Sequence, residues 1–509
     1  MGKKNRKAKA ERVSQQVVTV PVRQQRGNYD GAGTGDEYKN IWANADRYDA
    51  DSANSRDVRH TLISRSRYEI ANNGFSDGIA QTYATDLVGI GPSLRMQTGS
   101  PGLNQLIERV WQQWAAAIGL RGKLWTSAHA KHSDGEGLGV IYRNPRVNHP
   151  IKLDWVLKEA EQCQTPWIPF TVESGGYIDG IRFDDFGNPV WYEFLTEHPG
   201  SNTRVDLTGA TEKISAYLVT HWFKIRRPGQ HRGIPECAST LNAGAAARRW
   251  REATIAAAET AANFTLFIHT EFDPDEMDGV APMSTMDIEK RMMTALPRGY
   301  KPEQMKAEHP TGNYETFHKS LVNEQARPKS MPYNKAACDS SSYNYASGRL
   351  DHQTYYASLD VDRADCNEQV LEKLFAVFMR EAIAVFGWFG GDPSAIQMAG
   401  FFHTWDWPKH RVADVQAEAD ANKTKLQSGQ LGLQRLYAEA GLDLEDEIPE
   451  MARTFGVDEK EIRRRLFDIC LPAAQQPAAP TQQPEPPPPA AASLNRILPN
   501  LNGATNGKH

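Results

Sequence analysis

The 509-residue chain contains little cysteine and no long apolar run. Its five cysteines lie at least 28 residues apart, and no two of them have CxxC spacing. An odd number at such distances predicts no disulfide framework and is typical of a protein made in a reducing compartment. The longest apolar stretch, residues 374–387, is interrupted by Arg380 and Glu381 and is shorter than the roughly 18 residues of a membrane span. We therefore expect neither disulfide bridges nor a contact with a membrane.

The sequence also lacks the short motifs of several common catalytic sites. It contains no GxxxxGK[ST] phosphate-binding loop, no GxGxxG after a strand and no GxSxG nucleophile turn. Nucleotide binding and serine hydrolase chemistry therefore have no motif to support them. We predict no catalytic residues and no cofactor.

The stretch that most resembles an enzyme site is HAKHSDGEGLG, residues 129–139. His129, His132, Asp134 and Glu136 are residue types that bind metal ions, and two histidines three positions apart share a helix face. A metal site normally takes a further ligand from elsewhere in the chain, and the glycine-rich end fits a turn equally well. We predict no metal site, and a metal-dependent nuclease or hydrolase using His129 and His132 is the alternative.

Charge is nearly balanced, with 58 basic and 63 acidic side chains and a net charge of −5. The chain is therefore not a nucleic-acid-binding protein of the strongly basic kind. The start, MGKKNRKAKAERV, is basic but has no apolar segment behind it, so it predicts no signal peptide. Residues 1–45 and the proline-rich residues 471–509 have compositions that favour disorder. We interpret the basic arm as solvated, with a contact to nucleic acid or a partner as the alternative.

The first half of the chain has mixed helical and strand patterns. Residues 48–83 and 106–118 have helical spacing, and residues 86–96 are expected to form a strand broken by glycine. Short strands dominate residues 138–223, and IRFDDFGNPVWYEF, residues 181–194, has the turn chemistry of a hairpin. These patterns predict an α/β body whose strands pair mostly in antiparallel hairpins.

The second half is mainly helical. Residues 234–268 predict one helix of about 35 residues, roughly 50 Å long, and eleven of residues 238–262 are alanine. Such small side chains allow a neighbouring element to approach closely. A small inserted α/β unit follows over residues 272–310, then a helix over residues 313–325. A second long helix runs to Phe386 with an apolar stripe, and a helical section over residues 408–471 contains QSGQLG as a turn.

The segment RRPGQHRGIP, residues 226–235, is a basic elbow before the alanine-rich helix. Arg226, Arg227 and Arg232 are the predicted hinge residues. Together with His231 they would bind phosphate, or they would lie in a turn whose arginines pair with carboxylates of a neighbouring subunit. We favour the turn, because the glycines and prolines around them restrict shape.

Several segments resemble the lambda-type family of portal proteins from tailed bacteriophages. They are RSRYEIANNGFSDGIAQTYATDLVGIG (65–91), HWFKIRRPGQHRGIPECASTLN (221–242), AAETAANFTLFI (257–268) and SSSYNYASGRLD (340–351). The section from Trp405 through LQSGQLGLQRLYAEAGLD is similar to the family's C-terminal helical part, so the resemblance runs from about residue 45 to 470. Ala346 stands where the family usually has serine, and Pro328 interrupts a stretch that family members tend to continue as a helix.

The resemblance implies an α+β portal fold assembled as a ring, typically of twelve subunits. Its expected parts are a disordered basic arm (1–45), an α/β wing (46–233), a stem helix (234–268), an inserted clip (269–313), a second stem helix (314–331), a tunnel loop (332–345), a tunnel helix (346–390), a C-terminal helical crown (391–470) and a disordered proline-rich tail (471–509). The loop is expected to face DNA through Asp339, Ser340, Ser341, Ser342, Tyr343, Asn344 and Tyr345. Portal proteins perform no covalent chemistry, so no enzyme activity is expected.

The implied function is a ring at the unique capsid vertex through which double-stranded DNA is packaged and later ejected. Expected partners are other copies of the chain, the terminase large subunit, the major capsid and scaffolding proteins, the head–tail connector and DNA passing without sequence specificity. The expected location is the virion, and the host cytoplasm during assembly. A slightly acidic chain fits a channel in which DNA slides, because each phosphate bound by Lys or Arg must be released again. Another connector ring of the head–tail junction is a further alternative.

Overall fold

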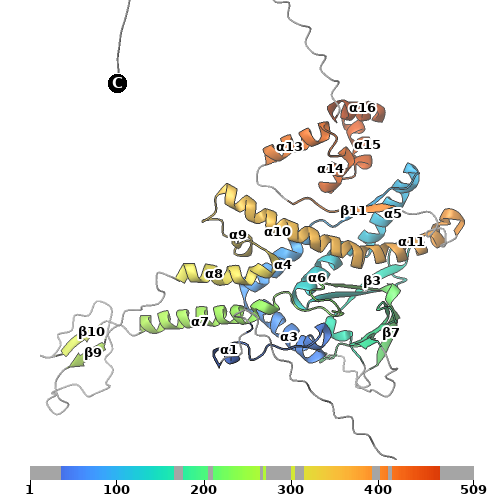
Figure 1. Cartoon of the computed structure of the whole chain (residues 1–509). Coiled ribbons are helices and arrows are strands. Elements are labelled where there is room, and N and C mark those ends of the chain that lie inside the picture. Colours follow the sequence, from blue (N-terminus) through green and yellow to red (C-terminus); the bar gives the residue numbers. More distant parts are fainter. Residues whose placement is uncertain are drawn as a thin grey trace, which may run out of the picture. The chain divides into compact units, whose positions relative to one another are not determined.

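The computed structural model describes residues 32, 36–165, 176–203, 210–263, 267–270, 300–303, 314–391, 402–410 and 415–470 (Figure 1). The proline-rich tail, most of the basic arm and most of the expected clip therefore lie outside the described residues. The chain divides into two compact units. The first comprises residues up to 77 with 130–138 and 158–328, and the second comprises 78–129, 139–157 and the residues from 329 onward.

The N-terminal region contains several helices, three of which cover the residues 48–83 that were predicted to be helical. The helices are α1 (Asp36–Ile41), α2 (Ala50–Ala53), α3 (Arg56–Asn72) and α4 (Gly74–Val88). The break falls at Asn73, whose side chain accepts from the backbone N–H of Phe75 while its own backbone N–H closes α3 on Glu69. Local side-chain bonding of this kind competes with helix continuation.

A four-stranded antiparallel sheet belongs to the first unit. Its order is β4 (Tyr177–Ile178), β5 (Ile181–Phe183), β6 (Pro189–Leu195) and β7 (Thr211–Ser215). The register places Ile181 opposite Tyr192 and Tyr192 opposite Ile214, and all three side chains are buried. The predicted β5–β6 hairpin is confirmed. A further sheet has the order β3 (Leu153–Lys158), β2 (Glu136–Arg143) and β8 (Val219–Phe223).

The alanine-rich helix α7 (Leu241–Asn263) is shorter than predicted and packs against α8 (Tyr314–Ala326), where the Trp250 and Tyr314 rings stack with centroids 4.7 Å apart. A 3-10 turn, Ala238–Thr240, precedes α7. The expected helix over residues 234–268 is wrong at both ends. Pro235 lacks the N–H that a helix interior needs, and residues 267–270 form strand β9, paired with β10 (Tyr300–Glu303). Aromatic and β-branched residues at 265–270 favour a strand.

The second unit is organised around an aromatic core. It includes α5 (Pro101–Ala117), most of α6 (Leu120–Ser133), α9 (Tyr333–Ala336), α10 (Tyr345–Cys366) and α11 (Glu372–Phe386). Trp111 on α5 contacts Phe378 of α11 at 5.0 Å and Trp405 at 5.2 Å between ring centroids. Trp405 lies on β11 (His403–Asp406), which pairs with β1 (Ser93–Met96). The expected strand over 86–96 is therefore shorter, because residues 86–88 complete helix α4.

The predicted long helix is confirmed, with an irregularity that its periodicity did not predict. Residues 367–371 form a π-helical turn, η7, between α10 and α11. The Trp407 indole donates to Asn367 Oδ1 at 2.8 Å beside this turn. The helix ends at Gly387, which has the left-handed conformation of a C-terminal cap. The apolar stripe from Val370 to Ile383 is buried, as predicted.

The C-terminal part of the second unit forms a small helical cluster. It consists of α13 (Val415–Gln427), α14 (Leu433–Glu439), α15 (Leu444–Phe455) and α16 (Glu459–Cys470). Leu444, Ile448, Ala452 and Ile462 form its core. The predicted turn at QSGQLG is confirmed, with Gly429 at φ +72°. Among all residues that the structure describes, no helix has the length and apolar character needed to cross a membrane.

Candidate functional site

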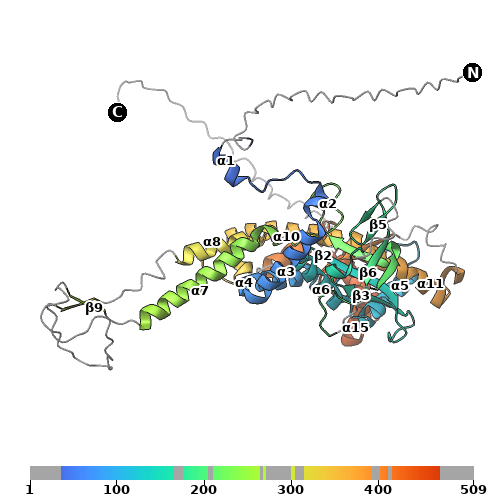
Figure 2. The same cartoon turned by 90° about the horizontal axis from the view of Figure 1, so that it is seen from below.

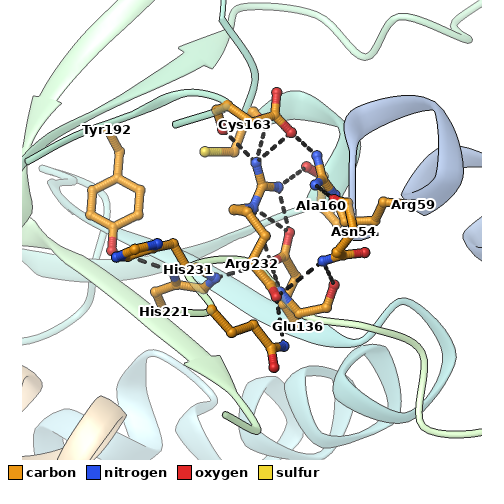
Figure 3. Close-up of polar contacts among 12 residues, drawn as sticks. Asn54, Arg59, Glu136, Ala160, Cys163, Tyr192, His221, His231 and Arg232 are labelled. Carbon is orange, nitrogen blue, oxygen red and sulfur yellow. Dashed lines mark hydrogen bonds and ion pairs between the residues drawn. The ribbon is translucent and has the colours of Figure 1, made fainter. Parts of the chain in front are cut away.

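The elbow before α7 is built around a buried ion pair between Arg232 and Glu136 (Figure 3). The Arg232 side chain is 2% exposed and the Glu136 side chain is fully buried. Arg232 Nη2 donates to Glu136 Oε1 at 2.5 Å, and Nε donates to both carboxylate oxygens at 3.1 Å. A bidentate ion pair of this kind fixes both the position and the orientation of the two side chains.

Other groups complete the hydrogen bonding of the pair. Arg232 Nη1 donates to the Cys163 carbonyl at 2.8 Å, and Glu136 Oε2 accepts from the Gly233 backbone N–H at 2.8 Å. His221 Nε2 lies 3.0 Å from Glu136 Oε2. Burial alone would raise the pKa of Glu136, but Arg232 and His221 outweigh burial and hold that pKa well below its usual range. The pair is therefore ionised at neutral pH.

A second arginine lies beside this pair. Arg59 of α3 forms an ion pair with Asp179, which Arg232 also contacts at 3.2 Å. Burial, and then the charge of Arg232, lower the pKa of Arg59 to about 9. The Asn54 side chain donates to the carbonyls of Arg232 and Gly233 at 3.2 and 3.1 Å, which ties the start of α3 to the elbow. Figure 3 shows the Asn54 and Glu136 side chains lying beside Arg232, with Arg59 close by.

Gly233 and Gly135 allow two backbones to approach closely. A Cβ added at Gly233 would lie 2.2 Å from the Gly135 carbonyl oxygen, and one at Gly135 would lie 2.3 Å from the Ile234 carbonyl carbon. Gly135 also has φ +91°, which favours glycine. The glycines of the elbow are thus required by shape.

The predicted hinge arginines have different surroundings. Arg232 is buried, while Arg226 and Arg227 are exposed and Arg227 donates to the Tyr48 carbonyl at 2.9 Å. The carboxylate that pairs with Arg232 belongs to the same chain, which corrects the interpretation that it pairs with a neighbouring subunit. His231 Nδ1 lies 2.7 Å from Asp51 Oδ2, so neither Arg232 nor His231 is available for the alternative phosphate site.

Residues 339–347, at the end of the loop over residues 332–345 and the start of α10, are joined by local hydrogen bonds. Asp339 Oδ1 accepts from the Ser341 N–H at 2.9 Å, and the Tyr343 N–H donates to the Ser340 carbonyl at 3.1 Å. Asn344 caps α10 by accepting from the Ser347 N–H at 2.8 Å. The side chains of Ser340, Ser341, Ser342 and Asn344 are exposed, those of Asp339 and Tyr343 are half-buried, and that of Tyr345 lies outside the described set.

Sequence reasoning missed the charged groups that anchor this loop. Lys335 of α9 forms an ion pair with Asp86 of α4 at 2.8 Å, and Tyr355 of α10 donates to the same carboxylate at 3.2 Å. Buried Lys329 lies 3.2 Å from the centroid of the Tyr83 ring and 3.7 Å from Asp362. Partners some 250 residues apart leave no local pattern in the sequence.

The carboxylates of the alternative metal stretch are bound by arginines. Arg67 forms a two-pronged contact with Asp134 at 2.9 and 2.7 Å, and Glu136 is held by Arg232. Within the described ranges, one group of three possible ligands lies close together, namely Glu159, Glu161 and His198. Arg67 also contacts both glutamates of that group, at 3.0 and 2.7 Å. The two carboxylates of the group are thus already paired with a guanidinium.

A model of the lambda family of phage portal proteins matches residues 39–363. The chain belongs to that family. The matched region of this portal protein contains both the elbow and the loop, and it ends inside α10. The resemblance of the C-terminal section to the family therefore extends beyond the matched residues.

Solved structures similar to this portal protein include parts of gene transfer agent particles and a phage portal protein. The virion of a native gene transfer agent particle matches with 15% identity and a TM-score of 0.43, covering 79% of this chain and 97% of the other. The neck of the native particle, computed with C12 symmetry, matches with 16% identity and a TM-score of 0.42. The match covers 75% of this chain and 93% of the other. An HK97 family phage portal protein from Corynebacterium diphtheriae matches with 13% identity and a TM-score of 0.25. The match covers 69% of this chain and 99% of the other. No curated protein matches.

Proposed function

We propose that this portal protein assembles into a closed ring of twelve copies at one vertex of a capsid, through which double-stranded DNA enters and later leaves. The match to the portal family over residues 39–363 is the observation that carries this proposal. The exposed alanines along α7 support it, because small side chains allow copies of the helix to pack side by side.

The parts of the ring follow the order of the chain. Residues 46–233 form the wing, and α7 and α8 form the stem. Residues 269–313 form the clip, 332–345 the tunnel loop, 346–390 the tunnel helix and 391–470 the crown. The antiparallel pair β9–β10 brings the start of the clip beside residues 300–303 within it, which supports an insertion that returns toward the stem.

The tunnel loop suits a sliding contact with DNA. Its exposed side chains are Cys338, three serines and an asparagine, and its one carboxylate, Asp339, is bonded within the loop. Without exposed Lys or Arg the loop forms no strong contact with phosphate, and DNA passes without sequence specificity.

Partners are assigned by analogy with the family. The terminase large subunit docks on the clip and performs the ATP hydrolysis, so the portal protein itself performs no catalysis. The head–tail connector later binds the same end, and the major capsid and scaffolding proteins contact the ring during assembly in the host cytoplasm.

Negative-stain imaging and mass photometry of the purified full chain test this proposal. Twelve copies of a 56.8 kDa chain give a ring of about 680 kDa with a central channel. A protein that stays a single copy at micromolar concentration, with or without scaffolding protein, would contradict it.

A further inference from the structure

The β5–β6 hairpin presents an unusual side chain at its tip. Phe186 is 90% exposed although phenylalanine normally gains from burial. Asp184 makes the turn rigid, because its carboxylate accepts from the N–H groups of Phe186 and Asn188 at 2.9 and 2.7 Å and from the Asn188 side chain at 3.0 Å. An exposed aromatic side chain on a turn whose backbone is already fixed loses little backbone entropy on binding, which suits an interface anchor.

The tip of this hairpin is also acidic. Hydrogen bonds from the Asn188 side chain and from backbone N–H groups lower the pKa of Asp184, which is therefore ionised at neutral pH. Asp185 beside it is exposed. We call Asp184, Asp185 and Phe186 the knob.

A basic pocket of about 460 Å³ lies in the same unit, at the foot of α7 and α8. Its lining includes Lys224, Arg226 and Arg327 as cations, Glu236 and Glu324 as carboxylates, and the Ser239 hydroxyl. We call this pocket the socket. Its walls come from the elbow, from the 3-10 turn before α7 and from the end of α8.

The socket carries positive charge that the described part of the chain does not neutralise. Within that part, none of Lys224, Arg226 and Arg327 forms an ion pair with a carboxylate. Glu236 is already bound by buried Lys131 at 2.7 Å, which leaves Glu324 as the carboxylate opposing three cations. The pocket is thus complementary to an acidic group.

Knob and socket belong to different surfaces of the first unit. Helix α7 runs away from the elbow, whereas the four-stranded sheet lies on the other side of it (Figures 1 and 2). The knob does not fill the socket of its own chain, because Phe186 is almost fully exposed. Two different complementary surfaces on one chain form a head-to-tail contact, and such contacts close into rings when the rotation permits.

We propose that the knob of one copy docks into the socket of the next copy. Asp185 would pair with Arg226 and Arg327, and the Phe186 ring would lie against a guanidinium and Pro328, a favourable arrangement of an aromatic face and a cation. This contact rests on the proposed ring and adds to it the residues that join neighbours.

The test uses two variants of the full chain that remove opposite halves of the contact. The knob variant carries Asp185→Arg and Phe186→Ala, and the socket variant carries Arg226→Glu and Arg327→Glu. Each alone should lose the ring in mass photometry and give single copies. Mixed in equal amounts, they retain one intact knob and one intact socket per pair, so they should give a dimer of twice 56.8 kDa.

Controls separate this contact from folding and from the ring itself. Phe402→Ala removes another exposed phenylalanine, 71% exposed, and should leave the ring intact. Circular dichroism should show that both contact variants melt like wild type. A chain with Asp185→Arg and Arg226→Glu together should recover rings, because the reversed charges again attract.

Specific outcomes would overturn the proposal. Wild-type rings from both contact variants would show that knob and socket do not join copies, while the ring itself stands. Single copies that give no dimer on mixing would assign the loss to another cause. Loss of duplex DNA binding by the socket variant, with its rings intact, would assign the socket to nucleic acid. A wild-type chain that forms no ring would instead contradict the proposed function.

Discussion

The elbow at residues 226–235 and the loop at residues 332–345 are both short, polar segments that precede a long helix, yet their charged groups differ in environment. In the elbow, Arg232 is buried with Glu136 and every polar atom of the pair meets a partner. In residues 339–344 of the loop, the serines are exposed and the hydrogen bonds join residues two to three positions apart, while the long-range ion pair of the loop lies at its start, between Lys335 and Asp86. The difference indicates that the elbow is held along its buried part by long-range contacts, whereas residues 339–344 of the loop leave their surface available.

The largest expected effect is loss of the buried ion pair. Arg232→Met removes the guanidinium and leaves Glu136 as a buried charge without its main partner. Removing one member of a buried pair costs about 3–5 kcal/mol. Thermal unfolding followed by tryptophan fluorescence would measure the loss.

Arg227→Met is the matched control for this change. Arg227 is exposed and donates one bond to the Tyr48 carbonyl, so its replacement should change stability by no more than about 0.5 kcal/mol. Equal losses for the two variants would show that burial does not distinguish the two arginines.

The same pair predicts a dependence on pH. Because the pKa of Glu136 is lower in the folded than in the unfolded chain, its ionised form stabilises the fold above the unfolded pKa of about 4.3. That contribution is lost as the pH falls through the folded-state pKa. Glu136→Gln should lower the melting temperature at pH 7, and the gap to wild type should narrow below pH 4. A gap that is constant from pH 7 to pH 3 would contradict this assignment.

A smaller effect is expected from the close approach of the two glycines. Gly233→Ala places a methyl group 2.2 Å from the Gly135 carbonyl oxygen, so the backbone must shift. Overpacking of this kind costs about 1–3 kcal/mol. Gly348→Ala in α10 meets only an ordinary contact at 3.7 Å and should stabilise the helix by about 0.5–1 kcal/mol. If Gly233→Ala and Gly348→Ala shifted the melting temperature in the same direction, that result would argue against a steric requirement for glycine at position 233.

The cap of α10 contributes less than either elbow feature. Asn344→Ala removes the acceptor for the Ser347 N–H, and loss of such a cap costs about 1 kcal/mol. Because the cap is local, amide hydrogen exchange should become faster in the first turn of α10 and stay unchanged in α11. Exposed Ser342→Ala serves as the control, and faster exchange throughout the long helix would show that the cap acts beyond its own turn.

The smallest effect on stability, within about 0.5 kcal/mol, is expected for Ser341→Lys with Ser342→Lys, because both side chains are exposed. The functional effect should be large if the loop faces DNA. Each added phosphate contact raises the salt dependence of binding by close to one unit, so packaging in vitro should stall and recover at higher salt. Packaging at the normal rate in low salt would place the loop away from the channel.

Local patterns predicted the parts of this molecule whose contacts are local. The apolar stripe from Val370 to Ile383 and the β5–β6 hairpin are examples, because their spacing and turn residues suffice to define them. The sequence predicted that glycine and proline set the shape of the elbow. It did not predict the buried ion pair, because Glu136 lies 96 residues from Arg232 and no sequence pattern connects them. The length of α7 was overestimated because the prediction extended the helix over Pro235 and over the aromatic and β-branched residues at 265–270, which disfavour a helix interior. Strand β11 was missed because four residues paired across 310 positions carry little periodicity.

The π-helical turn at residues 367–371 divides the long helix into two parts that are out of phase. A π turn bonds residue i to i+5 rather than i+4, so it accommodates one extra residue. Since successive residues of an α-helix are rotated by about 100°, the side chains of α11 are displaced around the axis by about that angle relative to an uninterrupted helix. Tyr355 and Leu359 before the turn and Leu374 and Phe378 after it are all buried, although no single unbroken helical period includes them. When related sequences are aligned, a one-residue gap at this point would mark where the turn was gained or lost.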